Sequence, residues 1–476
     1  MGDGEKYLLL LGLYGAASAG FIFSRIEENH LRFFDIPVYL TILVFVEFGL
    51  APLECFASPE RFNFNFAGDP SPLLKALVYV IAGMAAFWAG CIAAGRKWGS
   101  KERPPAPTRE GPTGRARLRI LQTTAGIYAV SLAVKFYLLS HQLYSYLGSN
   151  HAYYQNLASM QVLNTIAGIG TYALVIACME KYLNPRDRKW KVLFWAIFTS
   201  ECSWGLISGM KGALLENLIL LAMISSLIQR RFRKAWVIAA VLGAVVLYPV
   251  SNAYRGLLRG GQGAVAVTNF VGAAKVGQRA IEQATREAAG PGAELLSGFR
   301  DTVSRLDLLQ SVGLILSLGP RAKDLLGSER WWMLPFYPFV PRFLWRSKPI
   351  LIEGGLFSVA LGIGASGTMI SSTAVTYPGD CYARGGLAGI LFGMFVLGIV
   401  AQWLTNTIVG PIDRRRLFVY AAIFLTFIDM EIDYFSFWSG FLKAFVILSI
   451  TAWLVYGPRS ELAGKRAAAR ALFART

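Results

Sequence analysis

The stretch GLAGILFGMFVLGIVAQWLTNTIVG, residues 386–410, decides the fold class of this sequence. It contains no charged residue over a length that crosses the hydrocarbon core of a bilayer when it forms a helix. Three consecutive arginines, residues 414–416, follow it closely. An uncharged run that ends in a basic cluster is typical of a transmembrane helix that reaches the cytoplasm.

Apolar runs of this kind recur along the whole chain. Hydrophobic residues make up 54% of the 476 positions and charged residues only 16%, with a mean hydropathy of +0.45. The other runs are residues 7–23, 36–56, 73–95, 118–140, 161–182, 190–209, 212–229, 235–253, 417–427 and 435–456. We therefore expect an all-α, polytopic integral membrane protein with about 11 transmembrane helices. A soluble protein would have to bury nearly every run in its core, so we set that class aside.

The connections between these runs differ in charge from one side to the other. Lys and Arg concentrate after residues 23, 95, 182, 229 and 410 and in the tail from residue 459, whereas residues 141–160 carry no charge. The positive-inside rule then predicts a periplasmic N-terminus and a cytoplasmic C-terminus. The formal net charge of +18 lies in these short connections, so we expect no nucleic-acid partner.

The longest connection, residues 254–385, breaks the charge pattern. It is expected outside the cytoplasm and yet carries 14 Lys and Arg residues, as long translocated loops can. We therefore divide the chain into residues 1–253, a periplasmic loop region 254–385, and residues 386–476. Apolar stretches at 306–318, 331–344 and 351–363 predict short or re-entrant helices inside this loop. Acidic residues offset part of the charge, and the arginines also suit an anionic, phosphate-bearing ligand.

The sequence contains no pattern that indicates a metal site or a disulfide framework. The five cysteines show no paired spacing, and most of them fall inside apolar runs. The connection 57–72 holds only Glu60 and Asp69, without the paired acidic motif that many lipid-dependent glycosyltransferases use to hold a divalent ion. We expect neither a metal nor a cofactor.

Three short motifs carry a resemblance to a known family. They are PRFLWRSKP at 341–349, YPGDCYARGG at 377–386 and GMKG at 209–212. Together with many helices and one large late loop, they resemble O-antigen and exopolysaccharide polymerases of the Wzy type. The second motif departs from the family's pattern at two places. Asp380 replaces the usual acidic residue, and Ala383-Arg384 replace a frequent Asn-Phe pair.

The resemblance implies a GT-C-like fold and a reaction. The reaction is glycosyl transfer between polyprenyl diphosphate-linked oligosaccharides at the periplasmic face of the bacterial inner membrane, with a chain-length regulator and a flippase as partners beside the bilayer. It implies catalytic roles for Asp380 and Asp307, as candidate bases, and for Arg342. Candidate ligands of the diphosphate are Arg255, Arg259, Lys211, Lys348 and Arg384.

Other functions remain open at this point. An O-antigen ligase would use the same donor and pass the glycan to lipid A core. A transporter or flippase of lipid-linked glycans would line a path through the membrane with charges and show two-fold repeats. A non-catalytic assembly partner of a secretion system would not need the outer charges for chemistry.

Overall fold

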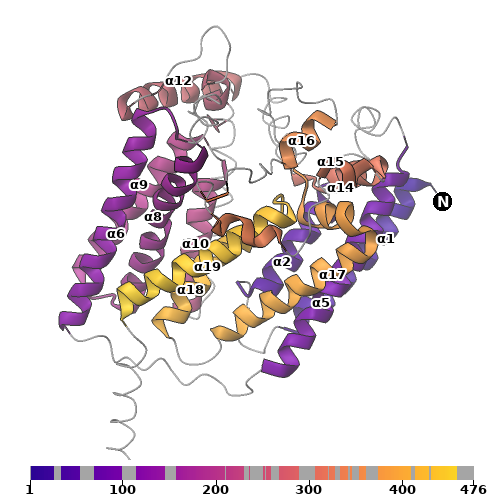
Figure 1. The fold of residues 1–476 in the computed structure, drawn as a ribbon, viewed down its shortest axis with the longest axis horizontal. Coiled ribbons are helices and arrows are strands. Elements are labelled where there is room, and N and C mark those ends of the chain that lie inside the picture. Colours follow the sequence, from indigo (N-terminus) through magenta and orange to yellow (C-terminus); the bar gives the residue numbers. More distant parts are fainter. Residues whose placement is uncertain are drawn as a thin grey trace, which may run out of the picture.

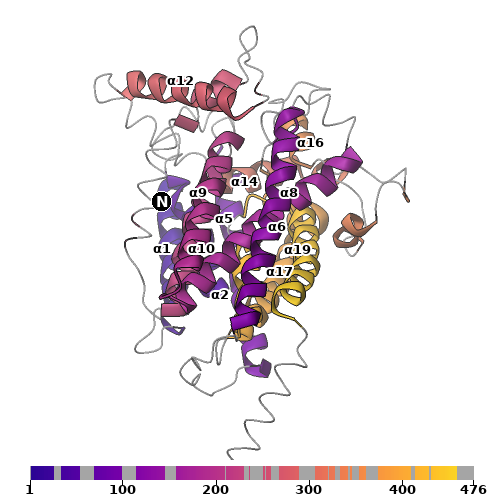
Figure 2. The ribbon, with the colours of Figure 1, turned by 90° about the vertical axis from the view of Figure 1, so that its left-hand side faces the viewer.

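The computed structural model describes most of the chain, and the account below concerns that part. The described residues are 2–25, 34–53, 69–98, 114–144, 157–209, 211–229, 235, 238, 250–251, 253–258, 267, 269–288, 306–319, 321–326, 333–340, 344–345, 353–360, 374–408, 413–427 and 430–457. Every regular element among them is helical (Figures 1 and 2). The long helices are α1 Asp3–Phe23, α5 Ser71–Trp98, α6 Gly114–Ser140, α8 Leu157–Leu183, α9 Arg188–Ser208, α10 Lys211–Gln229, α17 Tyr377–Thr407 and α19 Tyr434–Tyr456.

Shorter elements connect or flank these helices. They are α2 Ile36–Phe45, the π-helix η1 Val46–Leu50, α12 Phe270–Ala288, α14 Leu309–Leu318, α15 Arg321–Leu326, the 3₁₀ helix η4 Leu334–Phe339, α16 Glu353–Ala360, α18 Arg414–Phe424 and the 3₁₀ turn η5 Leu425–Phe427. The apolar stretches expected at 306–318, 331–344 and 351–363 thus contain α14, η4 and α16. The loop region holds short helices, as its composition indicated.

Six of the described helices are long and apolar enough to cross a membrane: α1, α5, α6, α8, α17 and α19. The all-α membrane class is confirmed at that level. The expectation of about 11 spans is met only in part, because α2 with η1 covers just Ile36–Leu50 and α18 just Arg414–Phe424. The runs at 190–209 and 212–229 form α9 and α10, which are not among the six, and the apolar part of α10 is Leu215–Gln229. Most of the run at 235–253 lies outside the described residues.

The helices form two groups that a third pair connects. α1, α2, α5, α14 and α17 pack together as the first helix group, and α6, α8, α9 and α10 as the second. α18 and α19 contact both groups and cross between them in Figure 1.

The closest packing in the first helix group is between α5 and α17, where two glycines remove the obstacle of a side chain. A Cβ at Gly90 would lie 2.2 Å from the Phe395 carbonyl oxygen, and one at Gly398 would lie 2.1 Å from that of Phe87. Small residues at membrane helix crossings allow this backbone approach. The Cys91 thiol also donates to the Gly398 carbonyl oxygen at 3.3 Å.

The two ends of the bundle differ. One end, here called the loop face, carries α12, α14, α15, α16 and the start of α1 (Figure 1). The other, here called the arginine face, is where α6, α9 and α18 begin with basic residues. These residues are Arg115, Arg117, Arg119, Arg188, Lys189, Lys191, Arg414, Arg415 and Arg416.

α17 begins nine residues before the expected span at residue 386. Pro378 occupies its first turn, and the Thr376 hydroxyl accepts a hydrogen bond from the Gly379 N–H at 3.1 Å, which starts a helix there. The expected boundary still has a structural mark, because Gly386 interrupts the helix with φ 61° and ψ −150°. The break separates a loop-face segment, 377–385, from the apolar span.

Candidate functional site

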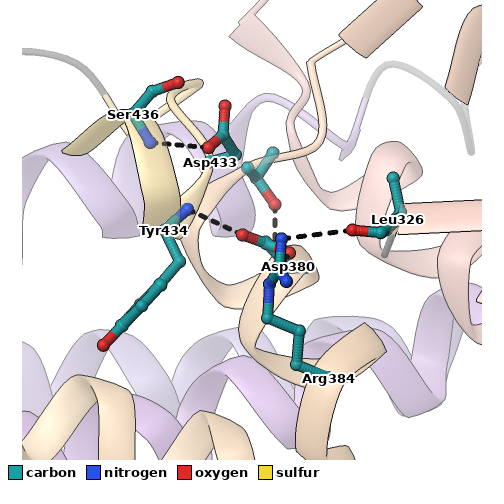
Figure 3. A network of polar contacts seen from close by, with 8 residues as sticks. Leu326, Asp380, Arg384, Asp433, Tyr434 and Ser436 are labelled. Atoms are coloured by element: carbon teal, nitrogen blue, oxygen red, sulfur yellow. Dashed lines mark hydrogen bonds and ion pairs between the residues drawn. The ribbon is translucent and has the colours of Figure 1, made fainter. Parts of the chain in front are cut away.

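A buried ion pair lies in the first segment of α17. Arg384 and Asp380 are one turn apart and therefore share a helix face. The Arg384 Nε donates to Asp380 Oδ1 at 2.7 Å, and the side chains are 2% and 0% exposed (Figure 3). A pair removed from water in this way persists only when its remaining polar atoms are also hydrogen-bonded.

Neighbouring elements supply those bonds. The backbone N–H of Tyr434, at the start of α19, donates to Asp380 Oδ2 at 3.0 Å. An Arg384 terminal nitrogen donates to the Leu326 carbonyl oxygen at 3.2 Å, at the end of α15, where a cation also meets the negative end of a helix dipole. Figure 3 shows these partners arranged around the pair. The pair therefore joins α15, α17 and α19.

The starts of α17 and α19 are connected by more than this pair. The N–H groups of Thr376 and Tyr377 donate to the carbonyl oxygens of Glu431 and Met430, each at 3.2 Å. The Tyr377 hydroxyl donates to the Gly393 carbonyl oxygen and accepts from the Trp438 indole, both at 3.1 Å. Because Gly393 follows the break at Gly386, this tyrosine bridges both segments of α17.

Asp307 lies at the other end of α14 from the ion pair. Its carboxylate accepts hydrogen bonds from the N–H and the side-chain amide of Gln310, at 3.3 and 2.7 Å. The next N–H, of Leu308, donates to the carbonyl oxygen of Glu47 in the π-helix η1 at 3.2 Å. Single π-turns are frequent at functional sites.

α14 connects Asp307 with the ion pair. A Cβ on Gly379 would lie 2.8 Å from the Ile315 side chain, so α14 packs directly on the first turn of α17. Asp307 lies two residues before the start of α14, and Ile315 lies six residues, or roughly 9 Å of helix, beyond that start. We call Asp307, Asp380 and Arg384 the α17 site.

A second cluster lies at the turn between α9 and α10. The Arg255 Nε donates to the carbonyl oxygen of Gly209 at 2.6 Å, and the Tyr254 hydroxyl donates to that of Ile207 at 3.2 Å. Burial raises the pKa of Tyr254 to about 12, so its phenol remains a donor at neutral pH. Gly209 ends α9 with φ 67°, and Lys211 begins α10 two residues later. We call Arg255 and Lys211 the turn site.

The residues expected from the sequence thus divide into these two clusters at the loop face. Asp380 meets Arg384, Asp307 lies two residues before the helix α14 that packs on their segment, and Arg255 meets the turn that contains Lys211. Arg259, Arg342 and Lys348 lie outside the described residues. Within the described ranges no three His, Cys, Asp or Glu side chains lie close enough to hold a metal ion.

One buried ion pair was not among the expected residues. Lys135 of α6 and Glu201 of α9 lie 2.5 Å apart, and each side chain is 6% exposed. A Cβ at Gly170 of α8 would lie 2.8 Å from Glu201 Oε1, so three helices enclose the pair. A lysine inside the apolar run 118–140 is the sequence signal, since charges in spans are costly. Its partner, on a different helix, is not evident from sequence spacing.

A third buried pair lies at the arginine face. The Arg414 Nε donates to Glu180 Oε1 at 2.9 Å, and the Asn184 side chain donates to Glu180 Oε2 at 2.7 Å. The Glu180 side chain is fully buried, whereas that of Arg414 is 23% exposed. The contact joins the end of α8 to the start of α18.

Comparison with known proteins gives one match. A family model described as "Domain of unknown function (DUF8712)" matches residues 121–428, more than half of the chain. No curated protein and no solved structure matches the chain. The matched region runs from α6 to the end of η5 and contains both the α17 site and the turn site.

Proposed function

This chain belongs to the family described as "Domain of unknown function (DUF8712)", and we propose that it is a glycosyltransferase that polymerises polyprenyl diphosphate-linked oligosaccharide repeat units. The product would be an O-antigen, a capsule or an exopolysaccharide. The supporting observation is that the Asp380–Arg384 pair of the α17 site and Arg255 of the turn site lie at the same face of the helix bundle. A polymerase must hold two lipid-linked substrates at one membrane surface.

The orientation proposed for the chain follows from charge. The arginine face collects the basic starts of α6, α9 and α18, so the positive-inside rule favours a cytoplasmic location for it. The loop face and the N-terminus are then periplasmic, and the C-terminus is cytoplasmic, in the inner membrane of a bacterium. A GT-C-like arrangement, with apolar helices below and loop helices above, belongs to the same proposal.

The proposed reaction makes one glycosidic bond per cycle. A hydroxyl oxygen of the acceptor glycan attacks the anomeric carbon of the donor glycan. The bond from that carbon to the diphosphate oxygen breaks, and its electron pair leaves with the lipid diphosphate. The hydroxyl proton passes to a carboxylate base. Because a diphosphate departs readily, the main tasks are to align the substrates and to stabilise the departing charge.

The clusters suggest a division of these tasks. Arg255 and Lys211 supply positive charge for the diphosphate, and Arg259, Arg342 and Lys348 are assigned to the same ligand from the sequence motifs. Asp307 is assigned the role of base. The Asp380 side chain is fully buried and ion-paired with Arg384, so we assign it to positioning that arginine. No step in this scheme uses a metal.

Polymerisation by the purified chain tests the proposal. Lipid-linked repeat units extracted from the native bacterium would be incubated with the chain in lipid nanodiscs, and the glycan products separated by length. We expect a ladder with wild type, and at least a tenfold lower rate with Arg255→Ala because a cation at the leaving group is lost. Arg188→Ala, at the exposed basic start of α9, is the matched control and should retain the ladder.

Other outcomes lead to other functions. Transfer of the glycan to lipid A core, with no ladder, identifies an O-antigen ligase. No product from a folded chain that receives its native substrate contradicts both enzymes. Partner proteins such as a chain-length regulator or a flippase would change ladder length or substrate supply, but not the formation of the bond.

A transporter of lipid-linked glycans is the second candidate, and one observation favours it. Helices of the second group bury two carboxylates in ion pairs at different depths, Glu201 with Lys135 toward the loop face and Glu180 with Arg414 of α18 at the arginine face. Charges along a membrane path are typical of transport proteins. Movement of a labelled lipid-linked glycan across proteoliposome membranes, without any new glycosidic bond, would establish this function.

A further inference from the structure

Helix α12 lies across the loop face, roughly perpendicular to α6 and α9 in both views (Figures 1 and 2). Its buried face consists of small residues, Ala273, Val276, Ala280 and Ala284. The first three pack in one cluster with Leu139 of α6 and Trp204 of α9. α12 is thereby held directly on the loop-face ends of these helices.

A second, apolar edge of α12 faces away from the protein. Phe270, Ala274 and Ile281 lie within roughly 40° of one another around the helix axis. Phe270 is 44% exposed and Ile281 is 54% exposed. The edge adjoins the buried face without being part of it, and about half of the Phe270 and Ile281 side chains remains uncovered by the described part of the protein.

The apolar edge continues the lipid-facing surface of the bundle. The Phe270 ring lies 6.2 Å from that of Trp204, which in turn lies 5.1 Å from Phe136 of α6. Phe136 is 48% exposed, and Leu206 on α9 is 50% exposed, as expected of residues that contact acyl chains. The exposed rings of Phe136 and Phe270 thus flank Trp204, which is itself buried, and this contact places the apolar edge of α12 beside the membrane helices.

The centre of the remaining arc of α12 is basic, and exposed Val271 and polar side chains flank it. Lys275, Arg279 and Arg286 are exposed and lie within roughly 40° of one another, on the side away from the apolar edge. None of the three forms an ion pair with another described residue. Glu282, which flanks this arc, accepts a hydrogen bond from Gln278 at 3.1 Å. The three basic side chains are available to an anionic surface.

We infer that α12 is an interfacial helix that binds the phospholipid surface at the loop face. Phe270 and Ile281 enter the boundary between headgroups and acyl chains, while Lys275, Arg279 and Arg286 contact headgroup phosphates. A helix with an apolar edge, a basic arc and a position at the ends of membrane helices has the properties that this location requires. Since Tyr254 packs in the same cluster, the bound helix fixes the depth of the turn site. The inference does not depend on the proposed reaction.

Photo-crosslinking to lipid tests this location in the full chain. A benzophenone amino acid would replace Ile281, or Glu282 as the matched control, in nanodiscs of equal phosphatidylglycerol and phosphatidylethanolamine. Mass spectrometry would then quantify the phospholipid adducts. Val130, exposed in the middle of α6, is the lipid-facing reference. We expect adducts at 281 to approach the reference and to exceed those at 282 several-fold; equal yields at 281 and 282 would overturn the location.

Lipid selectivity tests the basic arc separately. At position 281, we expect wild type to enrich phosphatidylglycerol in the adducts by about two- to fivefold, which corresponds to the headgroup attraction known for about one basic residue. Lys275→Gln, Arg279→Gln and Arg286→Gln together should return the ratio to that of the nanodisc. These three substitutions change only exposed side chains. If the protein labelled at position 281 misfolds, the same ratio is measured with the benzophenone amino acid at position 270. An unchanged ratio would overturn the assignment to headgroups.

Discussion

At the scale of single residues, Lys135 and Glu201 show how an apolar surrounding determines the role of a charge. Each side chain is 6% exposed, so each has lost most of its hydration. Their mutual attraction offsets that loss only while both are present. Ser131 donates to the Ala167 carbonyl oxygen at 2.6 Å beside the pair, and Gly170 leaves room for it. The pair therefore links α6, α8 and α9.

Replacing either Lys135 or Glu201 alone should lower the free energy of unfolding much more than replacing both. We expect Lys135→Met or Glu201→Leu to lower the free energy of unfolding by about 3–5 kcal/mol, because a buried charge is left uncompensated. The double variant should recover most of that loss. Thermal unfolding in one detergent would measure all three. A double variant no more stable than the single variants would show that the pair is not the source of the effect.

Gly386 is a second residue whose role is conformational. Its φ of 61° and ψ of −150° belong to a region that only glycine occupies readily, and outside its own helix backbone no atom of the described residues lies within 4 Å of where a Cβ would be. We expect Gly386→Ala to destabilise the protein by about 1–3 kcal/mol through backbone strain alone. Gly440→Ala, at an uncrowded helical position in α19, is the control and should be neutral or slightly stabilising. Equal melting temperatures for the two variants would contradict the break in α17.

At the scale of elements, the contact between α5 and α17 organises the first helix group. Gly90 and Gly398 face the opposite backbone, so an added methyl group must separate the helices. We expect Gly398→Ala to cost about 1–3 kcal/mol, as overpacking does. Gly126→Ala in α6, where a Cβ meets nothing within 4 Å, should not destabilise. Chemical unfolding of both variants would measure the difference, and a stable Gly398→Ala would refute the close crossing.

The sequence predicts some elements better than others, and the reason is physical. Hydropathy locates α1, α5, α6, α8 and α19 to within a few residues, because lipid-facing helices are apolar on most sides. It misses the start of α17 because the segment 377–385 is polar. This segment is held by hydrogen bonds with Thr376 and Tyr434, which a hydropathy profile does not detect. The expected second span, 36–56, changes from an α-helix into the π-helix η1 at Val46, which hydropathy also does not reveal.

The candidate site was predictable only in its parts. Asp380 and Arg384 are four residues apart, so a helix assigned to 377–385 would have paired them from the sequence. Arg255 lies 46 residues from Gly209, and that contact depends on tertiary packing. Lys135 and Glu201 lie 66 residues apart for the same reason. The charged residue types in the sequence predicted a cluster at the outer face. Only the structure shows that the described members of this cluster divide into two sites.

At the scale of the whole molecule, the charge difference between the two faces predicts the orientation. We expect Lys6→Cys, at the exposed start of α1, to react with an impermeant maleimide in spheroplasts, because the loop face is periplasmic. Arg188→Cys at the arginine face should react only after lysis. Wild type corrects for the native cysteines. Labelling of Arg188→Cys in intact spheroplasts would invert the topology and place the proposed reaction on the cytoplasmic side.

The proposed reaction also requires both clusters to act in one cycle across the two helix groups. Asp380 then acts by holding Arg384 in place through their ion pair. A longer acidic side chain at position 380 should preserve this ion pair better than a neutral side chain. We expect Asp380→Glu to retain more polymerisation activity than Asp380→Asn when both elute as folded protein. Equal activity of the two variants would contradict a positioning role for the carboxylate.

The most direct measurement is the release of lipid diphosphate by the purified chain. Lipid-linked repeat units carrying a labelled polyprenyl diphosphate would be incubated with the chain in nanodiscs, and the free lipid diphosphate and the new glycosidic bonds would be counted together. The account predicts one lipid diphosphate released for each bond formed, with both lost in Arg255→Ala. A folded chain that binds or moves the lipid-linked glycan without releasing its diphosphate would contradict the proposal.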